Sequence, residues 1–90
     1  MDLKQCSDEE LIVRYRDGDT DAMDFIFERY KHLVRKKAKA MFLAGGDNDD
    51  LIQEGMIGLY KAIRDYNTDR EASFATFASM CINRQMITAV

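Results

Sequence analysis

Apolar residues recur along most of the chain at steps of three and four positions, the spacing that places them on one face of an α-helix. The first such stretch follows a capping-box pattern, in which Ser7 precedes Glu10 by three positions. Gly18 comes shortly after the last apolar position and is a stop signal. Residues 7 to 18 therefore predict a short first helix.

A longer apolar stripe predicts a second, amphipathic helix from about residue 20, capped by Asp19 or Thr20, to the glycine pair at residues 45 and 46. Its basic residues Arg35, Lys36 and Lys39 point towards the solvent side. The apolar positions of the stripe are Met23, Ile26, Phe27, Tyr30, Leu33, Val34, Ala38 and Met41.

The stretch DLIQEGMIGLYKAI, residues 50 to 63, predicts the middle of a third helix, capped within residues 47 to 49 and ending near Tyr66. It contains Gly55 and Gly58, each of which costs a helix interior about 1 kcal/mol relative to alanine. We expect Gly55 to let a neighbouring backbone approach closely, with Gly58 at the edge of the core face. On a helical wheel that face holds Leu51, Ile52, Gly55, Met56, Leu59, Ala62, Ile63 and Tyr66.

The opposite face of this third helix carries two apolar side chains, Ile57 and Tyr60, among Asp50, Gln53 and Glu54. A solvated face is the ordinary interpretation of such a mixture. However, a small apolar patch with a polar rim is the layout of a protein interface. We therefore predict a protein-binding surface here.

A fourth helix begins near Ser73 or Phe74 and continues to the end of the chain. One side of it places Phe77, Arg84 and Thr88 in a row, and aromatic rings, guanidinium groups and hydroxyls are the groups that stack on bases and bind base edges. Because no cap or polar tail ends this helix, we expect the chain to be a piece of a longer protein. The packed side is expected to hold Ala75, Ala78, Ile82, Met86 and Ala89.

The composition supports a helical protein, since the 90 residues include no proline and five glycines. We predict an all-α fold, a compact bundle of about four helices in a single domain. The net charge of −3 argues against simple electrostatic adhesion to nucleic acid. The charge is uneven, however, because the charged side chains of residues 31 to 46 are all basic. Within this segment, Arg35, Lys36 and Lys39 are candidates for phosphate contacts.

Cys6 and Cys81 lack the spacing of a zinc site or a disulfide framework, so reduced thiols and no metal or other cofactor are expected. The chain has no signal-peptide pattern and no apolar run long enough to cross a bilayer, so we expect a cytoplasmic protein without a membrane partner.

Two other functions, calcium binding and catalysis, lack the residues that they require. Residues 17 to 28 place acids at four positions of a calcium-binding loop, but Ala22 replaces its glycine and Asp24 its central apolar residue. His32, the only histidine, has no carboxylate or thiol partner at local catalytic spacing. The sequence therefore predicts neither calcium binding nor an enzyme.

The sequence resembles region 2 of the sigma-70 family of bacterial RNA polymerase sigma factors. The residues that carry this resemblance are DLIQEG, IGL and KA of the third helix, followed by FATFA with an isoleucine four residues on. The following CINRQMITAV is most similar to sigma-H-type alternative factors, a class associated with sporulation. By this resemblance, residues 7–46 correspond to regions 1.2 and 2.1, residues 47–66 to region 2.2, and residues 67–90 to regions 2.3 and 2.4.

The resemblance implies a domain that docks on the clamp coiled coil of the largest polymerase subunit and recognises and helps to melt the promoter −10 element, chiefly through its non-template strand. An anti-sigma factor is a further implied partner. The polymerase-binding residues expected from the resemblance and from the exposed patch are Asp50, Gln53, Glu54, Met56, Ile57 and Tyr60. Met56 also falls on the predicted core face.

For DNA, the resemblance implies that Tyr66, Arg70 and Phe77 surround an unstacked adenine, while Arg84 and its neighbours read the upstream double-stranded edge of the element. The full set of expected DNA-binding residues is Tyr66, Arg70, Phe77, Met80, Cys81, Arg84, Gln85 and Thr88.

The chain departs from primary sigma factors at these positions. Met80 and Cys81 stand where those factors carry two tryptophans, and Arg84 and Ile87 replace their base-reading Gln and Thr. Because arginine favours bidentate contact with guanine, a guanine at the upstream edge of the element is expected. A region resembling the −35-reading helix-turn-helix is absent from the sequence. The remaining alternative is a helical protein-interaction module without a role on DNA.

Overall fold

The computed structural model describes residues 3–42, 48–69 and 72–89. These residues form a short 3-10 helix, η1 (Leu3–Gln5), and four α-helices, α1 (Asp8–Arg16), α2 (Thr20–Phe42), α3 (Asn48–Asp65) and α4 (Phe74–Ala89). The described ranges contain no strand. The prediction of an all-α bundle of four helices is therefore confirmed, with η1 as an addition.

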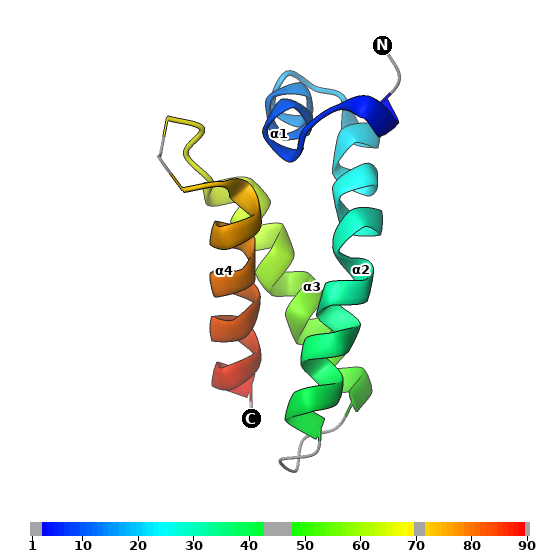
Figure 1. The fold of residues 1–90 in the computed structure, drawn as a ribbon, viewed down its shortest axis with the longest axis vertical. Helices are drawn as coiled ribbons and strands as arrows, with labels where there is room; N and C mark the ends of the chain where they lie inside the picture. Colours follow the sequence, from blue (N-terminus) through cyan, green and yellow to red (C-terminus); the bar gives the residue numbers. More distant parts are fainter. Residues whose placement is uncertain (1–2, 43–47, 70–71, 90) are drawn as a thin grey trace.

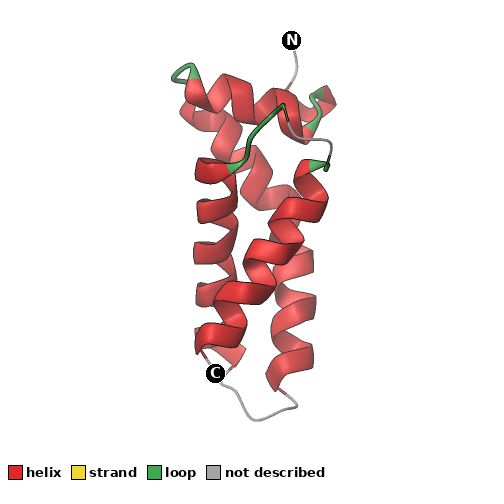
Figure 2. Cartoon of the chain, turned by 90° about the vertical axis from the view of Figure 1, so that its left-hand side faces the viewer, coloured by secondary structure: helices red, strands yellow, loops and turns green. Residues whose placement is uncertain are grey.

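The helix α3 lies at the centre of the arrangement. It is flanked by α2 and α4 along the long axis, while α1 lies across one end of the bundle (Figure 1). The most extensive packing joins α3 to α4, and the next joins α2 to α3. The described connections gather at the end that α1 covers (Figure 2). The resulting body is elongated, with principal extents of 43 × 24 × 18 Å.

Side chains close the helix ends where the sequence predicted them. The Ser7 side chain accepts from the Glu10 N–H at 3.1 Å, and the Ser7 N–H donates to Glu10 Oε1 at 3.0 Å, so the capping box is formed. This backbone hydrogen bond holds the pKa of Glu10 below its usual range. Of the two candidate caps for α2, Asp19 accepts from the Asp21 N–H at 3.1 Å.

The turn between α1 and α2 needs a backbone that only glycine adopts easily. Gly18 has a φ of +106°, in the region where side-chain-bearing residues are strained. The prediction that Gly18 ends the first helix is confirmed. Of the three candidate caps for the third helix, Asn48 and Asp49 lie within α3, and Asp47 lies outside the described residues.

The core is built from the apolar stripes of all four helices. Phe74 is the largest fully buried side chain of the described residues, with ring centroids 5.6 Å from Tyr30 and 5.3 Å from Tyr66, both edge-on. The prediction that Ala75 packs inside is wrong: Ala75 is exposed, and the stripe starts one residue earlier. Its buried members are Phe74, Ala78, Ile82 and Met86, four residues apart, and the side chain of Ala89 lies outside the described part.

The two glycines of α3 have different neighbours, and this corrects the expected role of Gly55. A Cβ placed on Gly58 would lie 2.9 Å from the Cys81 carbonyl oxygen and 2.9 Å from Ile82 Cα. A Cβ on Gly55 would instead meet the Met86 methyl group and Val34 Cγ1, which are side-chain atoms. The close backbone approach therefore occurs at Gly58, where α4 crosses α3.

The calcium-loop pattern does not form a loop, since α2 begins at Thr20 and takes up most of it. The described residues contain no cluster of three or more His, Cys, Asp or Glu side chains suited to a metal ion. Within the same ranges, no helix combines the length and apolar character needed to span a membrane.

Candidate functional site

The outward face of α3 carries the predicted apolar patch. Ile57 and Tyr60, three residues apart on one face of the helix, are each 43% exposed. Asp50 and Gln53 are exposed beside them, and Glu54 is half-buried. The structure therefore brings these five residues to one side of α3, as the sequence predicted.

Met56 lies at the edge of this face, three residues after Gln53 and four before Tyr60. It is half-buried and lines a groove of about 450 Å³ between α2 and α3. The groove has an apolar floor and charged walls of both signs. Its lining residues are Asp24, Phe27, Glu28, Lys31, Arg35, Ile52 and Met56.

The corner between α3 and α4 holds the predicted aromatic pair. Tyr66 is 3% exposed, and its hydroxyl donates to the Ala72 carbonyl oxygen at 2.8 Å. Its ring lies 5.6 Å from the half-buried ring of Phe77, tilted by 51°. Phe77 is therefore the more accessible ring, and Tyr66 supports it from the core. Arg70, the expected cation of this corner, lies outside the described residues.

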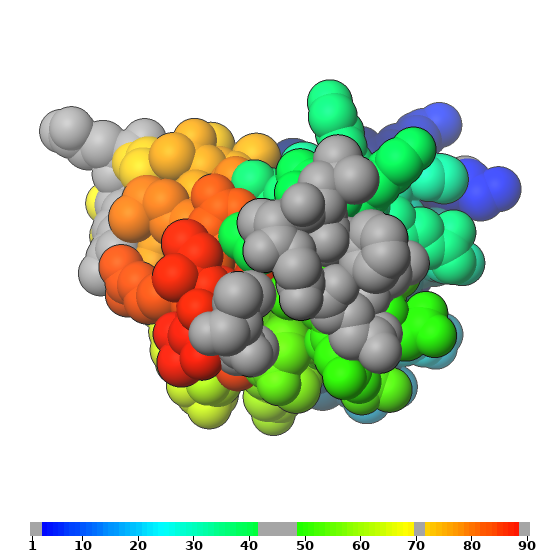
Figure 3. All heavy atoms as spheres, turned by 90° about the horizontal axis from the view of Figure 1, so that it is seen from below, coloured from blue at the N-terminus to red at the C-terminus, as the bar shows by residue number. Residues whose placement is uncertain are grey.

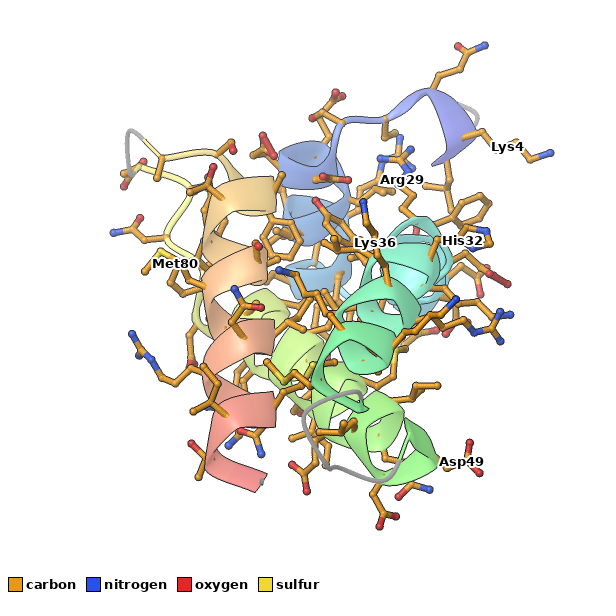
Figure 4. All side chains as sticks on the ribbon, turned by 60° about the horizontal axis from the view of Figure 1, so that its bottom comes forward. Lys4, Arg29, His32, Lys36, Asp49 and Met80 are labelled. Atoms are coloured by element: carbon orange, nitrogen blue, oxygen red, sulfur yellow. The ribbon has the colours of Figure 1, made fainter. Side chains whose placement is uncertain are left out.

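Most of the expected DNA-binding residues of α4 reach the surface. Met80 is 52% exposed and projects from the helix in Figure 4, whereas its neighbour Cys81 is half-buried. Arg84 and Thr88 are exposed one turn apart, and the Thr88 hydroxyl donates to the Arg84 carbonyl oxygen at 2.8 Å. Ile87 is 65% exposed. The outer side of α4 thus combines a cation, a hydroxyl and apolar groups.

Gln85 lies on a different side of α4 from these residues. Its Nε2 donates to Glu54 Oε2 at 2.7 Å, and its Oε1 accepts from Lys61 Nζ at 2.9 Å. Gln85 therefore binds two residues of α3, one of them in the predicted polymerase-binding set. Seen from the end of the bundle, the last turns of α4 lie against α3 (Figure 3).

The basic residues in the last two turns of α2 differ in their surroundings. Arg35, Lys36 and Lys39 are exposed, as predicted, and Figure 4 shows Lys36 and His32 projecting from α2. Lys37 instead donates from Nζ to Asn83 Oδ1 at 2.9 Å, which ties α2 to α4. Sequence spacing gave no signal for this long-range contact.

The last turn of α3 carries an ion pair. Arg64 donates from Nε to Asp65 Oδ1 at 2.8 Å and from Nη2 to Asp65 Oδ2 at 2.9 Å. These hydrogen bonds lower the pKa of Asp65 and raise the pKa of Arg64. Both side chains are exposed, so the pair adds little to stability.

Comparison with known proteins gives the family. The family model described as "Sigma-70 region 2" matches residues 26–90. The chain belongs to this family. Over 86 residues it is 50% identical to the RNA polymerase sigma-H factor of Bacillus subtilis (strain 168), covering 96% of this chain and 39% of that protein. The predicted resemblance to region 2 of sigma-H-type factors is confirmed.

More distant relatives of this region 2 chain are other RNA polymerase sigma factors. It is 34% identical to the sigma-K factor of Bacillus subtilis (strain 168) over 70 residues, 78% of this chain and 24% of that protein. It is 33% identical to the sigma-F factor of the same strain over 76 residues, 84% of this chain and 30% of that protein. The region 2 chain thus spans well under half the length of these curated relatives.

Proposed function

We propose that this region 2 chain serves in an RNA polymerase sigma factor, where it binds the clamp coiled coil of the largest core subunit and recognises and helps to open the promoter −10 element. Family membership supports the general role. The observation that carries the docking part is the exposed pair Ile57 and Tyr60 on α3, with a rim of Asp50, Gln53 and Glu54.

The polymerase would cover the outward face of α3. Burying Ile57 and Tyr60 removes apolar surface from water, and the surrounding carboxylates and amide offer acceptors to basic or polar groups of the clamp. Met56, which lines the groove beside α2, would add contacts at the edge of this face. An anti-sigma factor is a further proposed partner of the chain.

The DNA would lie on the corner and outer side of α4. A base that leaves the duplex exchanges stacking in the helix for stacking on an aromatic ring, worth about 1 to 3 kcal/mol. Phe77 offers such a ring, backed by Tyr66, and Arg70 would add a cation. Met80 and Cys81 would form a softer wedge than the tryptophan pair of primary sigma factors. Arg84 would read guanine at the upstream edge, with Thr88 beside it.

The net charge of −3 implies that affinity for the promoter depends on the polymerase. The exposed residues Arg35, Lys36 and Lys39 are the proposed phosphate contacts within the chain. We further propose that residues 7–46, 47–66 and 67–90 correspond to sigma regions 1.2 and 2.1, region 2.2, and regions 2.3 and 2.4. The site of action would be the cytoplasm, and the role requires no catalytic residue or cofactor.

The test is binding of the chain to core RNA polymerase or to its isolated clamp coiled coil. Gln53→Ala and Glu54→Lys should each weaken saturable binding by about 1 kcal/mol or more. Gln5→Ala, the matched change in η1, should leave it unaffected. Absence of binding by folded wild-type chain would reject the docking surface and favour a protein-interaction module that acts without DNA.

A further inference from the structure

One arginine of α1 reaches the end of α3. Arg16 lies in the last turn of α1, and its Nη2 donates to the carbonyl oxygens of Ile63 and Arg64 at 3.3 Å each. The same nitrogen also donates to the Tyr66 carbonyl oxygen. These acceptors follow Arg16 by 47 to 50 positions, so the contact belongs to the tertiary structure.

The carbonyl groups at the end of a helix lack partners within the helix and need donors from elsewhere. A glycine or asparagine in the left-handed region commonly supplies this ending. Within the described ranges, however, only Gly18 has a positive φ, so the described part of the turn after α3 contains no such residue. The Arg16 guanidinium supplies the donors instead, and its charge is favourable at the negative end of the α3 dipole.

The contact bears directly on the aromatic corner. Tyr66, whose carbonyl Arg16 binds, also donates its hydroxyl to Ala72 across the turn at 2.8 Å. The Tyr66 ring touches both Phe74, at the start of α4, and Phe77, one turn later. Arg16 therefore fixes the backbone of the residue that supports the Phe77 ring.

We propose that Arg16 is a positioning residue for base capture, which holds the end of α3 so that Tyr66 and Phe77 present a preformed aromatic surface to an unstacked base. This inference rests on the proposed function. A preformed surface binds more tightly because less ordering is needed when the base arrives. Loss of Arg16 should thus weaken capture of the base without altering the polymerase-binding face of α3.

The experiment compares wild-type chain, Arg16→Gln and the control Arg14→Gln, which removes the same charge from the same helix, each bound to core RNA polymerase. The probe is a non-template-strand oligonucleotide that the wild-type complex recovers from a randomised pool. It is then made with 2-aminopurine in place of each adenine in turn. Arg16→Gln should weaken strand capture about tenfold, the effect of losing charge-assisted hydrogen bonds. The affinity of Arg16→Gln for core polymerase should stay within about twofold of wild type. Arg14→Gln should stay within the same range for core polymerase and for the DNA strand.

A salt titration separates positioning from direct contact with DNA. If Arg16 bound a phosphate, Arg16→Gln would lower the slope of log affinity against log salt by about 1, and this outcome would overturn the proposal. An unchanged slope together with weaker capture supports it. Equal capture by wild type and Arg16→Gln would also overturn it.

Hydrogen exchange on the chain without DNA provides the structural readout. Peptides covering residues 64 to 77 should exchange faster in Arg16→Gln than in Arg14→Gln, and equal rates would contradict the positioning role. Arg16→Lys keeps a cation but loses the guanidinium fork, so it should show a smaller change in strand capture and in hydrogen exchange than Arg16→Gln. It replaces Arg16→Gln if that variant does not fold. If wild-type chain binds polymerase but captures no strand, the proposed DNA function fails, and the role of Arg16 in capture fails with it.

Discussion

The side-chain amide of Gln85 on α4 donates a hydrogen bond of 2.7 Å to the Glu54 carboxylate on α3. Glu54 belongs to the face proposed for polymerase docking, and Gln85 belongs to the helix proposed for promoter reading. The amide oxygen of Gln85 also accepts from Lys61, so both ends of the amide are bonded to α3. The two proposed binding helices are therefore joined by a polar contact as well as by their apolar packing.

This contact predicts a measurable coupling between the two residues. In a double-mutant cycle with Glu54→Ala and Gln85→Ala, the free energies of unfolding should deviate from additivity by about 1 kcal/mol, because a half-buried hydrogen bond to a charged group is lost only once. Urea denaturation measures each variant. The control pair Glu54→Ala and Thr88→Ala should be additive. Additivity in the Gln85 cycle would mean that the contact contributes nothing in solution.

The close crossing at Gly58 predicts that alanine at this position destabilises the fold. An added Cβ would lie 2.9 Å from two backbone atoms of α4, which cannot move without shifting the helix. Gly58→Ala should destabilise the fold by about 1 to 3 kcal/mol, despite the better helix propensity of alanine. Thermal or urea unfolding would measure this. Gly55→Ala is the comparison: its Cβ would meet side-chain atoms only, and because the Met86 methyl group can rotate but the β-branched Val34 is stiff, it should also destabilise the fold, without displacing the backbone of α4.

Tyr30 predicts a loss of stability at alkaline pH. Burial, and then a hydrogen bond to Asp8, raise the pKa of Tyr30 well above its usual value. The stabilising contribution is therefore complete below the unfolded-state pKa of about 10 and is lost as pH rises towards the folded-state pKa. The advantage of wild type over Tyr30→Phe in free energy of unfolding should shrink between about pH 9 and pH 11.

Arg84 predicts an altered base preference. A guanidinium binds the O6 and N7 of guanine with two hydrogen bonds, and this discriminates against other bases by about 1 to 3 kcal/mol. Arg84→Ala, in complex with core polymerase, should lose preference at one upstream position of the −10 element and keep it elsewhere. Selection from a randomised duplex library would detect this. Unchanged preference at every upstream position would reject Arg84 as a base reader. The control is Lys36→Ala, a proposed phosphate contact, which should weaken binding to all sequences alike.

Much of the local structure followed from the sequence. The capping box at Ser7 formed, Gly18 ended α1, and the patch around Ile57 and Tyr60 is exposed. These features depend on neighbours within about one helical turn, so periodicity and capping rules determine them. The family motifs in α3 and α4 are local in the same sense.

The sequence by itself determined which side of each helix is apolar, but only the tertiary structure decided what that side meets. Periodicity could not tell that Gly58, rather than Gly55, receives a backbone, or that Gln85 turns towards α3. Nor could it pair Arg16 with the end of α3. Such contacts depend on how the helices cross, which is set by the packing of many side chains from distant parts of the chain.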